Sequence, residues 1–122
     1  MEKAITNLLK LQNQLRICHW QTESYAEHKA LGNAYEDLDG QIDELVEVYQ
    51  GKRGRIKYDS PLALNLVNYD EVSLMDLLDA IVEYLITGFE VNLDSVGDSD
   101  IKNIRDSILA TINRLRYLLT LK

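Results

Sequence analysis

Four helical patterns are unevenly spaced along this chain, and their spacing limits its fold more than any other feature. Apolar residues recur with a helical period in four stretches, which predicts helices at about residues 3–22, 25–50, 73–93 and 99–120. Only a few residues separate the first helix from the second and the third from the fourth. The second and third are separated by residues 51–72, which show no helical stripe. The chain therefore divides into two helical pairs with one long link.

These link lengths select a topology. Short links force consecutive helices to pack antiparallel. An extended link of about 20 residues spans up to about 66 Å, whereas a helix of about 24 residues is about 36 Å long. The middle link can therefore cross the whole bundle. Two antiparallel hairpins joined by one long crossover make the ferritin-like arrangement, so we expect an all-α, ferritin-like four-helix bundle that forms a single domain over residues 1–122.

Each predicted helix carries an apolar stripe that we expect to face one shared core. Ser24 and Glu27 have the spacing of a capping box at the start of the second helix, and Ser73 marks the start of the third. Gly51 and Gly54 are expected to end the second helix. The stripes consist of Ala4, Leu8, Leu11, Leu15 and Cys18; Leu31, Ala34, Leu38, Ile42, Leu45 and Tyr49; Leu74, Leu77, Leu78, Ile81, Leu85 and Phe89; and Ile101, Ile104, Ile108, Ile112, Leu115 and Leu119.

The charge of the chain is concentrated in one predicted helix. The formal net charge is −7, and residues 23–50, with eight acids and one base, account for all of it. An acidic chain without a basic tail argues against direct DNA binding. No apolar run reaches the roughly 18 residues of a membrane span, no signal-peptide core follows Met1, and a single cysteine cannot form an internal disulfide. We therefore expect a cytoplasmic protein that contacts no membrane.

One flank of the second predicted helix combines a histidine with carboxylates. His28, Asp39, Asp43 and Glu47 fall on the same side of the helical wheel, beside the apolar stripe. Asp43 and Glu47 are one turn apart, so both carboxylates can reach one point. On the first helix, His19 falls within the apolar stripe, where an imidazole needs a polar partner. Iron(II) and manganese accept carboxylates together with imidazoles, so these residues are candidate metal ligands.

Plainer interpretations stay open. An acidic helix flank is usually solvated, and a histidine on an apolar face is usually a hydrogen-bonded core residue. The basic residues Lys52, Arg53, Arg55 and Lys57 could contact an anion or a nucleic acid, and the first three could bind a regulatory partner. The simpler expectation is that they balance the adjacent acidic helix or form pairs between subunits.

The joint pattern of His19-Trp20, His28 and Asp43-x-x-x-Glu47 resembles the Dps family, the DNA-protection-during-starvation proteins or mini-ferritins. The resemblance is best over about residues 5–50 and is architectural beyond them. A short, divergent member of this kind would suit a compact genome such as that of a phage, in which case the cytoplasm is that of the host.

The resemblance implies a ferroxidase centre across a two-fold dimer interface. His19 and His28 of one subunit would face Asp43 and Glu47 of the partner, with Asp39 nearby. Iron(II), or another divalent metal, would bind there and be oxidised by peroxide or oxygen. The ferric product would be stored in a hollow homo-oligomer of dodecamer size, which would protect DNA by removing iron and peroxide.

The chain also departs from the family. Gly32 stands one turn after His28, where the family usually has an acid, and Asp39 or Glu36 are the acids that could compensate. The Glu-x-x-His motif of larger di-iron bundles is absent, so no di-iron site is expected within one subunit. The alternative function is therefore a non-catalytic assembly or interaction protein that has kept the ferritin-like fold and lost ferroxidase activity.

Overall fold

The structure, a computed structural model, describes residues 1–89, 93, 94 and 96–121, and within these it contains helices and no strand. The prediction of an all-α bundle of four helices is confirmed. The four helices are α1 (Glu2–Gln21), α2 (Tyr25–Arg53), α3 (Leu74–Glu83) and α4 (Ser99–Leu118). Two short elements accompany them, the 3-10 turn η1 (Tyr69–Glu71) and the π-helical turn η2 (Tyr84–Gly88) that continues α3.

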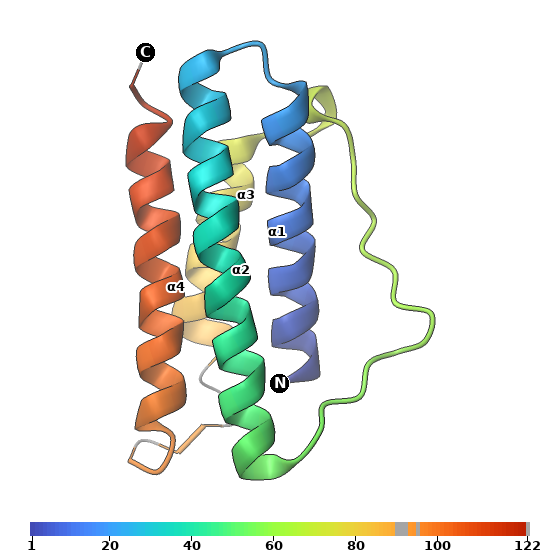
Figure 1. Cartoon of the computed structure of the whole chain (residues 1–122), viewed down its shortest axis with the longest axis vertical. Coiled ribbons are helices and arrows are strands. Elements are labelled where there is room, and N and C mark those ends of the chain that lie inside the picture. Colours follow the sequence, from blue (N-terminus) through green and yellow to red (C-terminus); the bar gives the residue numbers. More distant parts are fainter. Residues whose placement is uncertain (90–92, 95, 122) are drawn as a thin grey trace.

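The helices form two antiparallel hairpins, and the long segment between them runs the length of the bundle (Figure 1). The helix α2 returns beside α1 and also packs against α4, while α3 packs against α4. Because residues 54–73 lead back to the end where α2 began, α2 and α3 point in the same direction. The N-terminus and the C-terminus lie at opposite ends of the bundle.

One core joins the four helices. In α1, every residue of the predicted stripe is buried, and α2 and α4 bury theirs except for the partly exposed Tyr49 and Leu119. In α3, Leu74 and Leu77 at the start of the stripe are only partly buried. The predicted third helix is regular only as far as Glu83, because the next turn widens to a π-helix. Of the rest of that prediction, residues 90–92 lie outside the described residues, and Leu93 is not helical.

Local sequence signals explain how α2 begins and ends. The Ser24 hydroxyl accepts a hydrogen bond from the Glu27 N–H at 3.2 Å, as an N-cap should. The second bond of a capping box would join the Ser24 N–H to the Glu27 side chain. Here the Ser24 N–H donates to the Thr22 hydroxyl instead, at 3.2 Å. Gly51 lies inside the helix, so the prediction that it ends α2 is wrong. The helix stops at Gly54, whose φ of +86° is a conformation that only glycine adopts freely.

The crossover is attached to α1 by glutamines. Gln14, only 1% exposed, donates to the Val67 carbonyl at 2.8 Å and accepts from the Val67 N–H at 2.9 Å. The Gln21 side chain accepts from the Tyr69 N–H at 2.7 Å. These amides give the extended chain the backbone partners that a neighbouring strand would otherwise supply. The crossover therefore follows α1 and leaves the outer face of α2 uncovered.

Candidate metal-binding site

Two histidines face each other where α1 turns into α2. His19 lies in the last turn of α1 and His28 in the first turn of α2, with a three-residue turn between the helices. Their rings stack with centroids 3.8 Å apart and planes 13° from parallel. The Nδ1 atom of each ring lies 2.7 Å from the main-chain oxygen of the other residue. The pair therefore ties the two helices together through two reciprocal bonds.

These bonds determine where the imidazole protons are. A carbonyl oxygen only accepts hydrogen bonds, so Nδ1 of each ring must carry the hydrogen. In the neutral form, the lone pair is then on Nε2, and no hydrogen-bond partner of either Nε2 is found among the described residues. Metal-binding histidines commonly donate their other ring N–H to a backbone carbonyl in this way. In the neutral form, both rings therefore have the hydrogen-bond arrangement that metal-binding histidines commonly have.

The stacking also limits how many ligands one ion can receive. The lone pair of Nε2 lies in the ring plane, and an ion about 2.0–2.1 Å away must lie close to that plane. Two nearly parallel planes at the stacking distance of 3.8 Å have no common point near the rings. One ion near the stacked rings therefore cannot bind both imidazoles, so each ring would serve a different ion.

The rings border an open pocket of about 380 Å³ on the outer face of the α1–α2 hairpin. Aromatic and cationic side chains surround it. The Arg16 guanidinium lies 4.0 Å from the centre of the Tyr35 ring and 5.7 Å from that of Trp20. Trp20, which lines the pocket, is 67% exposed, although large aromatic side chains are usually buried. Tyr25 does not line the pocket, but its ring centre lies 6.4 Å from that of His28 and it is 76% exposed. Exposed aromatics around a polar pocket are typical of surfaces that bind a partner.

The place of His19 on the apolar stripe predicted that it lies in the core, and this prediction is wrong. It is half-buried at the edge of the bundle, and the neighbouring Cys18 is the residue that is fully buried. Burial raises the pKa of the Cys18 thiol, which makes it a poorer nucleophile. The predicted need for a polar partner is met, but the partner is a backbone carbonyl of α2. The sequence does not identify this carbonyl, because the path of the turn decides which carbonyl His19 meets.

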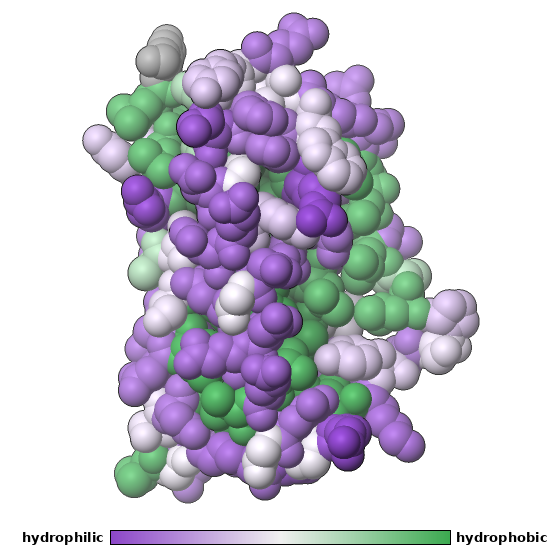
Figure 2. All heavy atoms as spheres, viewed as in Figure 1, coloured by the Kyte–Doolittle hydropathy of each residue, from purple (hydrophilic) through white to green (hydrophobic). Residues whose placement is uncertain are grey.

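The predicted carboxylate ligands lie elsewhere on the chain. Asp39, Asp43 and Glu47 are all exposed on α2. The face of the bundle seen in Figure 2 is mostly hydrophilic, with hydrophobic side chains showing in its lower half. Asp39 accepts a hydrogen bond from Gln12 at 2.9 Å. Asp43 is fifteen residues from His28, about 22 Å along the helix axis. Within one chain the acids and histidines therefore do not meet, and the described residues contain no cluster of three or more side chains placed to hold a metal.

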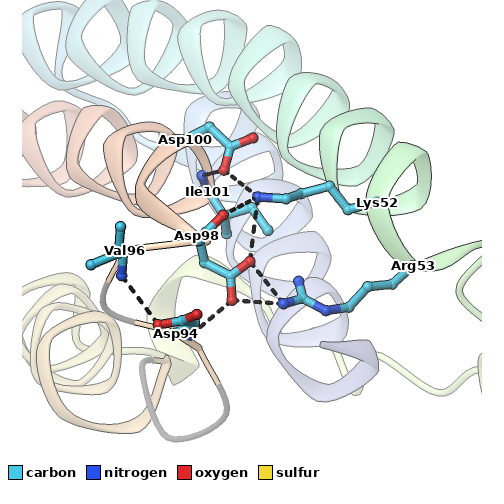
Figure 3. Close-up of polar contacts among 8 residues, drawn as sticks. Lys52, Arg53, Asp94, Val96, Asp98, Asp100 and Ile101 are labelled. Carbon is cyan, nitrogen blue, oxygen red and sulfur yellow. Dashed lines mark hydrogen bonds and ion pairs between the residues drawn. The ribbon is translucent and has the colours of Figure 1, made fainter.

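Two residues of the basic segment are bound inside the chain (Figure 3). Arg53 donates to both oxygens of Asp98 at 2.8 and 2.7 Å, and Lys52 lies 2.7 Å from Asp100. The expectation that they balance the acidic helix α2 is wrong, since their partners begin α4. We call these four residues the charged clasp. It occupies Lys52 and Arg53, two of the basic residues that an anion, a nucleic acid or a regulatory partner could have contacted.

The centre of the charged clasp is a buried carboxylate. Asp98 is 1% exposed and also accepts the Asp94 N–H at 2.8 Å. The Arg53 guanidinium, followed by that N–H, holds the pKa of Asp98 well below its usual range. The aspartates at positions 94, 98 and 100 were the sequence signal for this cluster, but nothing local indicated which cations they meet.

Comparison with known proteins places the chain in one family. Residues 19–119 match the family of unknown function DUF5856, and the chain belongs to that family. The matched range contains both histidines and the acids of α2. Searches of the curated proteins and of the solved structures found no match. No described helix is long and apolar enough to cross a membrane.

Proposed function

We propose that this protein is a Dps-like member of the ferritin-like class that binds iron(II) at sites between subunits and oxidises it. The observation that carries the proposal is the reciprocal histidine pair. Its hydrogen bonds place both protons on Nδ1 and leave both Nε2 atoms without a partner among the described residues. The pair faces an open pocket on the outer face of the hairpin, where a second chain can reach it.

The architecture supports the same class. Two antiparallel hairpins with a crossover along the bundle are the arrangement of ferritin-like proteins. In that class, the histidine and carboxylate ligands belong to helices of the bundle. Here the first hairpin carries every candidate ligand, and its outer face is not covered by the crossover. A subunit of this shape can therefore present the whole candidate set to a partner.

Two-fold symmetry would complete the site. A two-fold axis perpendicular to α2 and close to Glu36 lies midway between His28 and the acids Asp43 and Glu47. Such an axis places the histidines of one chain opposite the acids of the other and repeats the site at the second position. Each chain is incomplete alone, because its own acids are about 22 Å away along the helix. The proposed partner is therefore a second copy of this chain.

The chemistry follows from the ligand set, with iron as the substrate. Each imidazole would bind one iron(II) ion, and the partner's carboxylates would bind both and favour the higher charge of iron(III). Each iron gives up one electron, so a pair reduces one peroxide to two waters while two protons are taken up from solvent. The ferric product would collect inside a closed homo-oligomer of dodecamer size. Another divalent metal that prefers the same ligands would compete for the site.

One observation favours the alternative of a non-catalytic assembly protein. The bonds between the two histidines join α1 to α2, so they already have a structural use without any metal. In that case the exposed aromatics Trp20 and Tyr25 serve only to join subunits.

The first test is an anaerobic iron(II) titration followed through the fluorescence of Trp20, which borders the pocket. Wild-type protein should show a saturable change that is lost in His28→Ala and in the double variant Asp43→Asn, Glu47→Gln. The double variant Asp37→Asn, Glu44→Gln is the matched control, because it removes the same charge from exposed positions of the same helix. If saturating iron leaves the emission of the wild type unchanged, the proposal fails.

A mixing experiment tests whether the site is shared. Histidine variants and acid variants should each be inactive alone. When they are mixed and allowed to exchange subunits, half of the random dimers are hybrids with one intact site, so about one quarter of the wild-type sites should return. No recovery, despite exchange demonstrated by mass spectrometry, would exclude a shared site. Light scattering measures the particle size, and only a closed oligomer has a cavity for mineral.

A further inference from the structure

Gly32 lies against the ring of His19. It follows His28 by one turn of α2, and it borders the pocket. A Cβ atom at this position would lie 2.7 Å from Cε1 and 3.1 Å from Nδ1 of His19. Non-bonded carbon atoms are most stable about 3.5–4.0 Å apart, so any side chain here would push the ring away. The imidazole therefore lies directly on the backbone of α2.

We infer that Gly32 is a positioning residue for the histidine pair. Its missing side chain leaves the space in which the His19 ring stacks on His28 and donates to the His28 carbonyl. In this arrangement a carboxylate at position 32 and the stacked pair exclude each other. Gly32 is then the residue that makes the histidine pair possible, and it is not a ligand position that has lost its ligand.

The reciprocal bonds extend the effect to both rings. The His19 carbonyl is among the last four of α1, which have no partner within the helix. The His28 ring satisfies it, and the His28 carbonyl in turn holds the His19 ring. A displaced His19 would lose its bond, the stacking and its defined tautomer together. The consequence for iron rests on the proposed function, whereas the placement of the rings does not.

The test compares two glycines of the same helix. Gly40 also lies within α2, but a Cβ atom there would meet nothing within 4 Å. Replacing glycine by alanine inside a helix normally stabilises it. Gly40→Ala should therefore raise the thermal midpoint, whereas Gly32→Ala should fail to raise it. If both variants gain stability equally, the inference is overturned.

The second readout is the tautomer of each ring, from nitrogen-edited NMR of the imidazoles at about pH 8, where a free imidazole is neutral. Wild-type protein and Gly40→Ala should show both rings protonated at Nδ1, and Gly32→Ala should lose this signature for His19. Unchanged tautomers in Gly32→Ala would contradict the inference.

A third variant, Gly32→Asp, tests the rival interpretation of the position. If position 32 has only lost an acidic ligand, Gly32→Asp should bind iron(II) more tightly and leave both tautomers unchanged. That result would overturn the inference. Displacement of the ring predicts weaker binding together with a lost tautomer signal. The thermal and NMR readouts require no iron. If the wild type binds no iron but the two alanine variants differ as expected, the proposed function fails and the role of Gly32 stands.

Discussion

The two ends of the bundle join their helices by opposite means. At one end, the rings of His19 and His28 tie α1 to α2 through backbone carbonyls. At the other end, Arg53 and Lys52 tie α2 to the start of α4 through the buried carboxylate of Asp98 and the exposed one of Asp100. The charged clasp has more ionisable groups and looks more like a functional site. Its cations and carboxylates, however, already bind each other.

The difference shows which end can take a ligand. The buried carboxylate Asp98 accepts both Arg53 bonds and a backbone N–H, so most of its capacity is used. The histidine pair uses one nitrogen of each ring and leaves the other without a partner in the described part of the chain. Unsatisfied ligand atoms beside an open pocket, and not the density of charge, therefore mark the candidate site.

The largest expected effect is a loss of iron(II) affinity when the histidine pair is removed. Loss of an outer-sphere partner typically weakens metal binding about 10–100-fold, so removing both ligands in His19→Ala, His28→Ala should cost at least about 100-fold. Asp98→Asn, at the other end, should leave iron(II) affinity unchanged. Titration followed by Trp20 fluorescence measures the iron(II) affinity of both variants. If both lose affinity equally, the histidine end is not the specific iron site.

The next effect is on stability at the clasp end. Asp98→Asn should lower the thermal midpoint by several degrees, because an amide cannot neutralise Arg53 and presents only one acceptor oxygen. The matched control is Asp100→Asn, since this side chain is 52% exposed and its partners are Lys52 and the Ile101 N–H. Differential scanning calorimetry at neutral pH should rank the two variants clearly. Equal thermal midpoints would mean that the buried carboxylate of Asp98 stabilises the fold no more than the exposed carboxylate of Asp100 does.

The same carboxylate predicts a pH dependence. The pKa of Asp98 is lowered in the folded protein, chiefly by Arg53, whereas an unfolded aspartate titrates near about 3.9. The stabilisation is therefore complete above that ordinary value and is lost as the pH falls towards the lower folded pKa. Urea unfolding from neutral pH to about pH 2 should show a steeper loss for the wild type than for Asp98→Asn. Parallel curves would contradict this linkage.

The smallest effect concerns the helix caps. Ser24→Ala and Ser73→Ala each remove an N-cap hydroxyl and should each cost about 1 kcal/mol. Only Ser24 lies in the turn that carries the histidine pair, so only its loss should speed hydrogen exchange of the amides near His28. If Ser73→Ala has the same local effect there, the turn is not specifically coupled to its cap.

The sequence alone determined the helices, most of the core and the two cap residues. These features are local, because helical period, capping hydroxyls and the link lengths act between residues close in the chain. The helical period also placed Asp43 and Glu47 on a flank of α2 beside the apolar stripe, and the structure shows both exposed. It also predicted that His19 needs a polar partner.

Only the tertiary structure decided which residues meet. The His19 ring finds a carbonyl nine residues away, and Gln14 holds a backbone segment 53 residues away. Arg53 meets Asp98 across 45 residues instead of the acids of its own helix. The role of Gly32 also appears only when α1 lies against α2. Such contacts depend on how whole helices pack, and helical period defines only the face that each helix presents.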